Sequence, residues 1–253
     1  MKTVWALLFV ASLPFMNGQA LAQLAPCQPA TFERNVYTVC EVDLRTQAVK
    51  LFWKRPDGVP FAYLSALPRS IKGNAGTLMF AINAGMFDPQ LKPVGVYVEQ
   101  GRVLAPVNTR SGFGNFHMKP NGVFFVKGDT AGVLETGAYL KQQPRPDLAT
   151  QSGPMLVING HIHRRFDRNS TSVKVRSGVG SKDAHTIIFA ISDGEVSFDA
   201  FARLFKDHLK SSNALFLDGG SAPSLYIPSL RSSGNILPLG PMIGVFGPAT
   251  APR

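Results

Sequence analysis

A short apolar segment that runs directly into an acid and two glycines is the feature that most constrains the fold of this chain. Residues 215–217 are all apolar and predict a buried strand. The segment continues without a spacer into Asp218, Gly219, Gly220 and Ser221. Paired glycines let a backbone turn sharply and present its N–H groups to a ligand, and open α/β sheets bind ligands where buried strands end. The alternative is a tight turn in which Asp218 bonds its own backbone, but the doubled glycine and the serine favour a ligand site.

The composition is that of a globular protein with many turns. Hydrophobic residues make up 45% of the 253 residues, and the chain contains 24 glycines and 19 prolines. Its formal net charge is +10, with Lys and Arg scattered along the sequence. No basic helix and no ladder of basic and aromatic residues is present, so a nucleic acid partner is not predicted. A basic surface favours anionic partners such as phosphorylated glycans or a membrane face, unless the charge serves solubility alone.

The first 22 residues predict a secretory signal peptide. Lys2 gives the positive start, residues 4–15 are mostly apolar, and Ala20-Leu21-Ala22 forms a small-x-small cleavage site. The apolar run is too short and too interrupted for a transmembrane segment. We therefore expect residues 23–253 to form one exported domain, either periplasmic or secreted.

The two cysteines of the chain, Cys27 and Cys40, lie close together near the start of this exported part. Exported proteins meet oxidising conditions, so a pair at this spacing predicts one disulfide that ties the first strand to the segment before it. Two thiols alone do not predict a metal site.

Hydrophobic patterning predicts many strands and few helices. Strands are expected at residues 37–43, 48–53, 77–82, 94–100, 102–107, 123–127, 155–158, 186–191 and 243–246. A short helix is expected at 61–71, and an amphipathic helix covers 198–210 with Ser197 as its N-cap. The order of strand, helix and strand between 186 and 217 predicts a right-handed crossover between parallel strands. If these strands are close neighbours, Asp193 and Asp218 emerge at the same edge of the sheet.

Four segments that combine polar residues with glycines stand out against this pattern. They contain Asn83 and Gly85, then Ser152 and Gly153, then Arg176, Gly178 and Gly180, and finally Asp218. Together they offer an amide, a hydroxyl, a guanidinium group, a carboxylate and backbone N–H groups. Arginine binds phosphate or carboxylate through paired hydrogen bonds, and glycines let backbone donors reach the same anion. A carboxylate beside a sugar can act as acid, base or nucleophile in glycosidic cleavage.

Other site chemistries fit the sequence less well. His161 and His163 alternate after a hairpin turn and form a pair that can hold a metal, but no third ligand is apparent nearby. The other interpretation is two exposed strand histidines, and the sequence leaves the choice open. Residues 219–223 lack the last glycine of the G-x-S-x-G nucleophile elbow. No cofactor is predicted.

The combination of these segments, in this order, resembles the phosphodiester glycosidase family, the domain of the mannose-6-phosphate uncovering enzyme and of related exported bacterial proteins. The segments that carry the resemblance are residues 83–87, 115–124, 151–159, 176–180, 192–194 and 217–221. The family's Asp-Gly-Arg turn reads Asp193-Gly194-Glu195 here. The resemblance implies a single α+β domain with a β-rich core of mixed sheet, a few packed helices and a polar cleft lined by these loops.

The resemblance also implies hydrolysis of a sugar-1-phosphodiester, which frees the sugar from a phosphate that stays on its carrier. On this interpretation Asp218 is the general acid/base or nucleophile, and Asn83 orients the sugar or the attacking water. Asp193 is a second carboxylate candidate unless it only forms a turn. The residues expected to bind the substrate are Arg176, which would hold the phosphate, and Gly85, Asn115, Gly153, Gly219, Gly220 and Ser221.

Two other functions stay open. One is a non-catalytic module of the cell envelope that binds a glycan or a phosphate, which would keep Arg176 and the glycine loops without needing an ionised Asp218. The other is a metal hydrolase that uses His161 and His163 and loses activity with a chelator. Release of free sugar from sugar-1-phosphodiesters separates the enzyme from the binding module.

Overall fold

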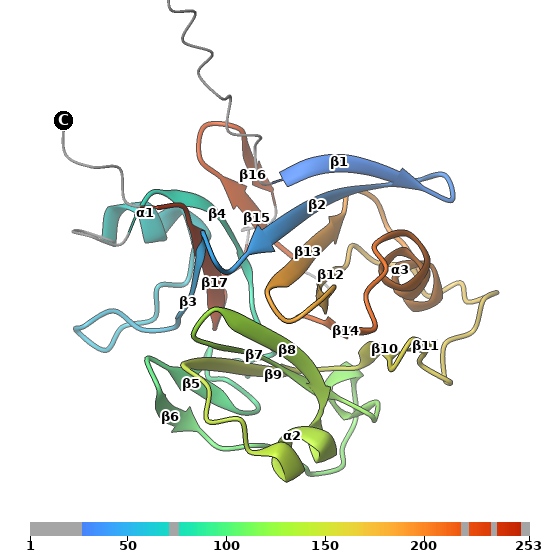
Figure 1. Cartoon of the computed structure of the whole chain (residues 1–253), viewed down its shortest axis with the longest axis horizontal. Helices are drawn as coiled ribbons and strands as arrows, with labels where there is room; N and C mark the ends of the chain where they lie inside the picture. Colours follow the sequence, from blue (N-terminus) through green and yellow to red (C-terminus); the bar gives the residue numbers. More distant parts are fainter. Residues whose placement is uncertain (1–26, 71–75, 219–222, 234–236, 249–253) are drawn as a thin grey trace, which may run out of the picture.

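The structure is a computed structural model that describes residues 27–70, 76–218, 223–233 and 237–248. Strands dominate it, and only short helices interrupt them (Figure 1). The predicted signal peptide, residues 1–22, lies outside the described residues. Within the described ranges no helix combines the length and the apolar character needed to cross a membrane.

Three sheets form the body of the protein. The strands are Cys27–Phe32 (β1), Asn35–Asp43 (β2), Ala48–Phe52 (β3), Leu78–Asn83 (β4), Tyr97–Glu99 (β5), Arg102–Ala105 (β6), Gly122–Lys127 (β7), Thr130–Glu135 (β8), Leu148–Ser152 (β9), Met155–Ile158 (β10), His161–Ile162 (β11), Ser177–Ser181 (β12), Thr186–Ser192 (β13), Asn213–Phe216 (β14), Leu225–Ile227 (β15), Arg231–Ser233 (β16) and Met242–Phe246 (β17). The seven-stranded sheet has the order β1-β2-β13-β12-β14-β10-β11. The two five-stranded sheets have the orders β16-β15-β4-β17-β3 and β6-β5-β9-β7-β8.

Every strand pairing of the described chain is antiparallel. The expected β-rich core with a few packed helices is confirmed, but its sheets are antiparallel rather than mixed. The two strands expected to be parallel neighbours, β13 and β14, do point the same way, because each pairs antiparallel with β12. They are not bonded to each other, since β12 lies between them. Asp193 and Asp218 therefore follow strands that end at the same edge of the seven-stranded sheet, as expected.

Most expected strands form within a few residues of their predicted bounds, but their partners differ from the local pattern. The strands expected at 37–43 and 48–53 are β2 and β3, and they belong to different sheets. β3 pairs with β17, almost 200 residues later in the chain. The hairpin expected at 94–107 forms as the shorter pair β5 and β6. Sequence patterning thus located the strands without assigning them to sheets.

The helices are shorter than expected. They are the α-helices Leu67–Ser70 (α1), Thr136–Gln142 (α2) and Phe198–Arg203 (α3), the 3₁₀ turns Leu64–Ala66 (η1) and Asn115–His117 (η2), and the π-helical turn Leu204–His208 (η3). The helix expected at 61–71 is reduced to η1 and α1, where Pro68 lacks an N–H for the preceding turn. The helix expected at 198–210 forms as α3 and η3. Its predicted N-cap is confirmed, because the Ser197 hydroxyl accepts the Ala200 N–H at 3.1 Å.

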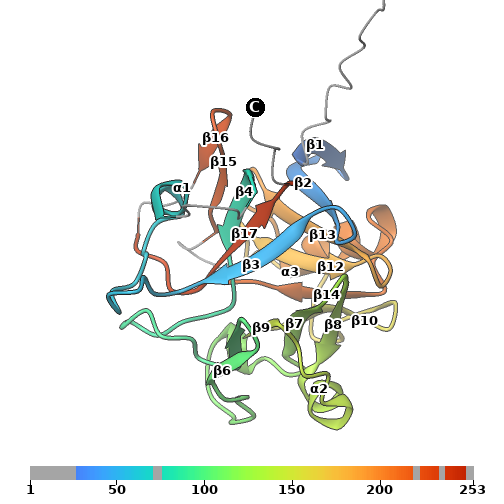
Figure 2. The ribbon, with the colours of Figure 1, turned by 60° about the vertical axis from the view of Figure 1, so that its left-hand side comes forward.

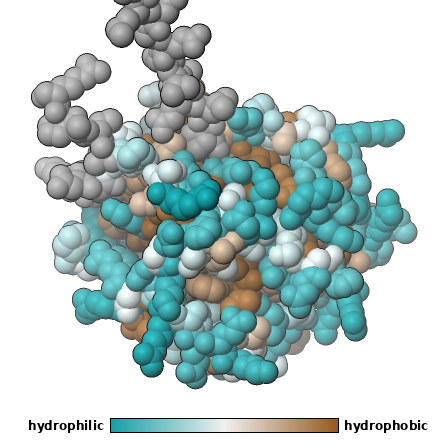
Figure 3. Space-filling view, in the orientation of Figure 1, coloured by the Kyte–Doolittle hydropathy of each residue, from teal (hydrophilic) through white to brown (hydrophobic). Residues whose placement is uncertain are grey.

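The main core lies between the three sheets. Buried side chains from all of them meet there, including Phe80 of β4 and Phe124 of β7, whose rings each contact the ring of Phe189 of β13 edge to face. Figure 2 shows β3, β4 and β17 running together above the sheet of β5 to β9. A second core packs α3 against the outer face of the seven-stranded sheet. Figure 3 shows hydrophilic residues covering most of one face of the molecule, with apolar residues in smaller patches.

A disulfide joins Cys27 to Cys40, as the sequence predicted. The two residues lie directly opposite each other in the register of β1 and β2. Cys40 belongs to the central core and is 1% exposed, so the bond anchors the edge strand β1 to a buried residue.

The glycines of residues 176–180 have a packing role that the sequence analysis did not assign. They were expected in a loop that presents N–H groups to a ligand, but residues 177–181 form β12 in the middle of the seven-stranded sheet. A Cβ on Gly178 would lie 3.1 Å from ring carbons of Phe201 and Phe205. A Cβ on Gly180 would lie 2.5 Å from the Ser211 hydroxyl and 2.8 Å from Phe205. The missing side chains let α3 and η3 approach the sheet closely.

We predict that Gly180→Ala lowers the free energy of unfolding by about 1–3 kcal/mol, because the added methyl group overpacks a tight contact. Gly194→Ala is the matched control, since a Cβ there meets no atom within 4 Å. Chemical denaturation of both variants measures the difference. Equal stability of the two variants would show that the glycines of β12 are not needed for helix packing.

Candidate functional site

The backbone of Asp218 is held where the ends of several strands meet. Its N–H donates to the Ala84 carbonyl at 3.1 Å. Its carbonyl oxygen accepts hydrogen bonds from Asn83 Nδ2 at 3.0 Å and from the Ser177 hydroxyl at 3.3 Å. The donors come from the end of β4 and the start of β12, which belong to different sheets. These contacts hold the backbone of Asp218 in place, and its side chain is half-buried.

Asn83 is fully buried, and both ends of its amide bond backbone groups. Besides its bond to Asp218, its Oδ1 accepts the Ser224 N–H at 3.1 Å. The Asn83 N–H also donates to the Ser224 carbonyl at 3.3 Å. Asn83 thus bonds the chain on both sides of residues 219–222. The bonds use the side-chain amide, the group that the sequence analysis had assigned to a sugar or to water. The predicted role of Asn83 toward a sugar or a water molecule stays a prediction.

Gly85 and Gly153 mark close approaches between backbones. A Cβ on Gly85 would overlap the Gln151 carbonyl oxygen, and the Gly85 N–H donates to the Thr150 hydroxyl at 3.1 Å. A Cβ on Gly153 would lie 2.7 Å from Cβ of Asn121 and 3.3 Å from the Asn115 carbonyl oxygen. Both glycines were predicted to bind substrate. The structure shows them bringing the loop after β4 and the loop around η2 against the C-terminal end of β9.

Gln151 is a buried polar residue to which the sequence analysis assigned no role. Its Oε1 accepts the N–H groups of Val96 and Asn108 at 3.0 and 2.9 Å. Its Nε2 donates to the Asn108 carbonyl at 2.8 Å and to the Thr136 hydroxyl at 3.2 Å. The sequence analysis counted Gln151 only among the residues that carry the family resemblance, and its burial follows from β9, a strand that the patterning did not predict.

Arg176 is buried on the α3 side of the sheet. Its Nε donates to the Val196 carbonyl at 2.8 Å, and Nη2 donates to the Ser172 carbonyl at 3.2 Å. The guanidinium carbon lies 3.6 Å from the ring centroid of Phe198, a cation–π contact. Burial lowers the pKa of Arg176 to about 10, so the side chain stays charged at neutral pH. In the described chain Arg176 forms no salt bridge.

These contacts favour a positioning role for Arg176, while its predicted contact with a substrate anion stays a prediction. The guanidinium group is occupied by carbonyl oxygens and a ring, and the residue is 3% exposed. Arg176 exchanges hydrogen bonds with Ser192 through its N–H and its carbonyl, both at 2.9 Å. It directly precedes Ser177, which bonds the Asp218 carbonyl.

Asp193 is exposed and engaged with a neighbouring cation. Its Oδ1 lies 2.8 Å from Arg231 Nη1, and the Thr38 hydroxyl donates to the same oxygen at 3.2 Å. Asp193 therefore shares a sheet edge with Asp218 but stands in its own polar cluster. Its role as a second catalytic carboxylate stays a prediction.

The other predicted substrate-binding residues are only partly described. Asn115 opens η2 and is half-buried. Gly219, Gly220 and Ser221 lie outside the described residues.

The two histidines considered as metal ligands lie in different surroundings. His161 is exposed at the start of β11, whereas His163 is 2% exposed, so the interpretation as two exposed strand histidines is wrong for His163. The reason is that β11 ends at Ile162 and the chain then turns His163 inward onto Phe166, with ring centroids 4.8 Å apart. Across the described ranges, no group of three or more His, Cys, Asp or Glu side chains is arranged to hold a metal ion.

We predict that Asn83→Ala lowers the free energy of unfolding by about 1–3 kcal/mol, because buried backbone groups lose their side-chain partners. Turnover should fall as well, since the Asp218 carbonyl loses one of its donors. Asn169→Ala is the control, because Asn169 is exposed. A variant as stable and active as the control would remove Asn83 from the support of this loop.

We predict that Arg176→Lys lowers stability by a similar amount, about 1–3 kcal/mol, because lysine cannot reach two carbonyls and stack on a ring at once. Denaturation and substrate kinetics on the same preparation separate the two roles. A raised KM at unchanged stability would instead indicate direct contact with a substrate anion. Arg102→Lys, at an exposed position, is the control.

Comparison with known proteins supports the assignment suggested by the motifs. The family model described as phosphodiester glycosidase matches residues 76–246, more than half of the chain. YigE of Escherichia coli, an uncharacterised protein, is 36% identical over 178 residues, which are 70% of this chain and 69% of YigE.

Two solved structures share the fold at low sequence identity. One is the catalytic domain of zebrafish N-acetylglucosamine-1-phosphodiester alpha-N-acetylglucosaminidase, auto-inhibited by its pro-peptide. It has a TM-score of 0.59 and 17% identity, covering 87% of this chain and 81% of that one. The other is a hypothetical protein from Synechocystis, with a TM-score of 0.57 and 16% identity, covering 87% of this chain and 61% of that one. The family model covers the strands from β4 to β17, which include members of all three sheets, and this chain belongs to the phosphodiester glycosidase family.

Proposed function

We propose that this chain is an exported hydrolase that cleaves a sugar-1-phosphodiester in envelope or extracellular glycans. The observation that carries the proposal is the backbone of Asp218, held by Ala84, Asn83 and Ser177 within the segment that the family model matches. Catalysis by a carboxylate requires a fixed position relative to the sugar. The backbone hydrogen bonds from Asn83 and Ser177 and to Ala84 give the Asp218 carboxylate such a fixed starting point.

In the proposed reaction the bond between the sugar C1 and the phosphate oxygen breaks. A water molecule supplies the hydroxyl group to the sugar, and the phosphate leaves with its carrier. As a general base Asp218 takes the proton of the attacking water, and as a nucleophile it bonds the sugar C1 before water displaces it; in both roles its negative charge stabilises the positive charge that develops on the sugar ring. As a general acid it gives its proton to the leaving phosphate oxygen. Asp193 stays the second carboxylate candidate.

The remaining residues position rather than react. Asn83 and Ser177 hold the carbonyl of Asp218, and Arg176 holds the start of β12 through the carbonyls of Ser172 and Val196. Gly85 and Gly153 let the neighbouring loops close around β9. The disulfide supports export, because such bonds persist in oxidising compartments.

The first test is to incubate the purified protein with sugar-1-phosphodiesters and to measure free sugar. Release of sugar, with phosphate retained on the carrier, supports the hydrolase. Binding of the same compounds without release would support the alternative, a non-catalytic glycan- or phosphate-binding module of the envelope.

We predict that Asp218→Asn lowers turnover by about 10²–10⁴-fold, the usual contribution of a general acid/base, with the fold retained. Asparagine keeps the shape of the side chain and removes its charge. The matched control is Asp207→Asn, at an exposed position on η3. Melting temperature and turnover are measured on both variants. A stable Asp218→Asn protein with near-normal turnover would exclude Asp218 from the mechanism and direct attention to Asp193.

A further inference from the structure

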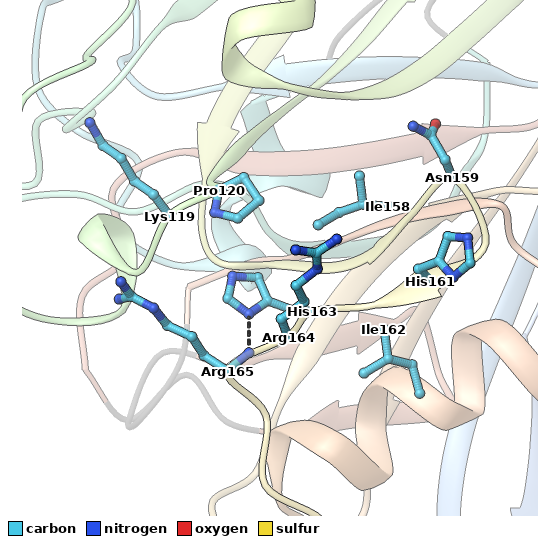
Figure 4. Close-up of a pocket in the computed structure, with 9 residues that line it drawn as sticks. All are labelled: Lys119, Pro120, Ile158, Asn159, His161, Ile162, His163, Arg164 and Arg165. Carbon is cyan, nitrogen blue, oxygen red and sulfur yellow. Dashed lines mark hydrogen bonds between the residues drawn. The ribbon is translucent and has the colours of Figure 1, made fainter.

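A cavity of about 770 Å³ lies beside the hairpin of β10 and β11 (Figure 4). One side is formed by the chain from Ile158 through β11 to Arg165, and the other by Lys119 with Pro120. The residues that hold the Asp218 backbone do not line it. The cavity and the candidate site lie along the same sheet. β10, whose last residue Ile158 lines the cavity, begins at Met155, which pairs with Leu215 of β14, the strand that leads to Asp218.

The cavity lining carries three cations and no acid. They are Lys119, Arg164 and Arg165, and none of them forms a salt bridge within the part of the chain that the structure describes. Lys119 instead donates to the Thr109 carbonyl. Cations gathered in a concave site without acids attract anions, and guanidinium groups bind phosphate oxygens in pairs.

His163 adds a buried donor to this lining. Its Nδ1 accepts the Arg165 N–H at 3.2 Å, so the neutral ring carries its proton on Nε2. Burial lowers the pKa of His163 and thereby favours the neutral ring. Hydrogen bonding to the Lys119 backbone raises the pKa, but by less than burial lowers it. Nε2 is buried and makes no hydrogen bond of good geometry within the described chain. Figure 4 shows Arg164, Arg165 and Lys119 arranged around this ring.

Apolar surface completes the lining. Pro120, Ile158 and Ile162 contribute it, next to the charged groups. A ligand that suits both parts has an anionic group for the cations and an uncharged body, such as the C–H face of a sugar, for the apolar surface. The volume exceeds what a single small anion fills.

We propose that this cavity is a phosphate-binding subsite for a phosphorylated glycan, in which Arg164 and Arg165 bind the phosphate oxygens and His163 Nε2–H is a further donor. The ligand class rests on the proposed function, whereas phosphate binding itself does not. The subsite would hold a phosphate group of the substrate while Asp218 acts at the sugar.

The test is calorimetric titration of the full exported chain with inorganic phosphate. Arg164→Ser/Arg165→Ser should raise the Kd by at least about tenfold, because charge-assisted hydrogen bonds are lost. The control is Arg102→Ser/Lys127→Ser, which removes the same charge at exposed positions outside the cavity and should change the Kd less than about twofold at physiological salt. His163→Phe keeps a ring on Phe166 but removes the donor, and should raise the Kd by a smaller factor.

Equal affinity of the cavity variant and the wild type, or an equal loss in the control, would overturn the proposal. Asp218→Asn should bind phosphate like the wild type, so failure of the proposed hydrolysis and failure of the subsite are seen separately. Sugar-1-phosphodiester kinetics then identify the ligand. A raised KM in the Arg164→Ser/Arg165→Ser protein supports a substrate phosphate, and an unchanged KM overturns the glycan assignment.

Discussion

The geometry of the candidate site depends on the buried side-chain amide of Asn83. An amide offers a donor and an acceptor in one rigid plane, so it can bond a carbonyl and an N–H at once without burying a charge. Asn83 does this for the Asp218 carbonyl and the Ser224 N–H. Ser177 bonds the same carbonyl from another sheet. The position of Asp218 is therefore a consequence of how two sheets meet.

A run of stacked side chains connects the basic cavity with this support. The ring of His163 stacks on Phe166, Phe166 stacks on Phe198 with centroids 5.0 Å apart, and the Arg176 guanidinium lies over Phe198. Arg176 is buried without a salt bridge among the described residues, so ring faces and carbonyl oxygens replace its hydration. Because Ser177 follows directly, the wall of the cavity and the carbonyl of Asp218 belong to one continuous packed region.

The sequence predicted much of the local structure. Periodic apolar residues located most strands and the helix capped by Ser197, because burial of one face imposes its period on the chain. The pair of Cys27 and Cys40 could be inferred from proximity in the sequence and an export signal. The pairing of β3 with β17 could not, because periodicity records which residues are buried and not which distant strand covers them. The same limit produced the expected mixed sheet, since a strand can enter between two parallel ones from elsewhere in the chain.

For the site, the sequence by itself determined the residue types and their order, which is sufficient to indicate the phosphodiester glycosidase family. Only the tertiary structure decided what each polar residue faces. Asn83 and Arg176 have the chemistry of ligand-binding residues, yet their side chains bond backbone groups: Asp218 and Ser224 for Asn83, and Ser172 and Val196 for Arg176. An exposed strand position was one of the two interpretations of His163, and the residue is buried because the chain turns inward after β11. A polar side chain at a strand end can hydrogen-bond a ligand or a backbone group equally well. Which partner it has depends on the segments that fold against it, and the local sequence does not specify those segments.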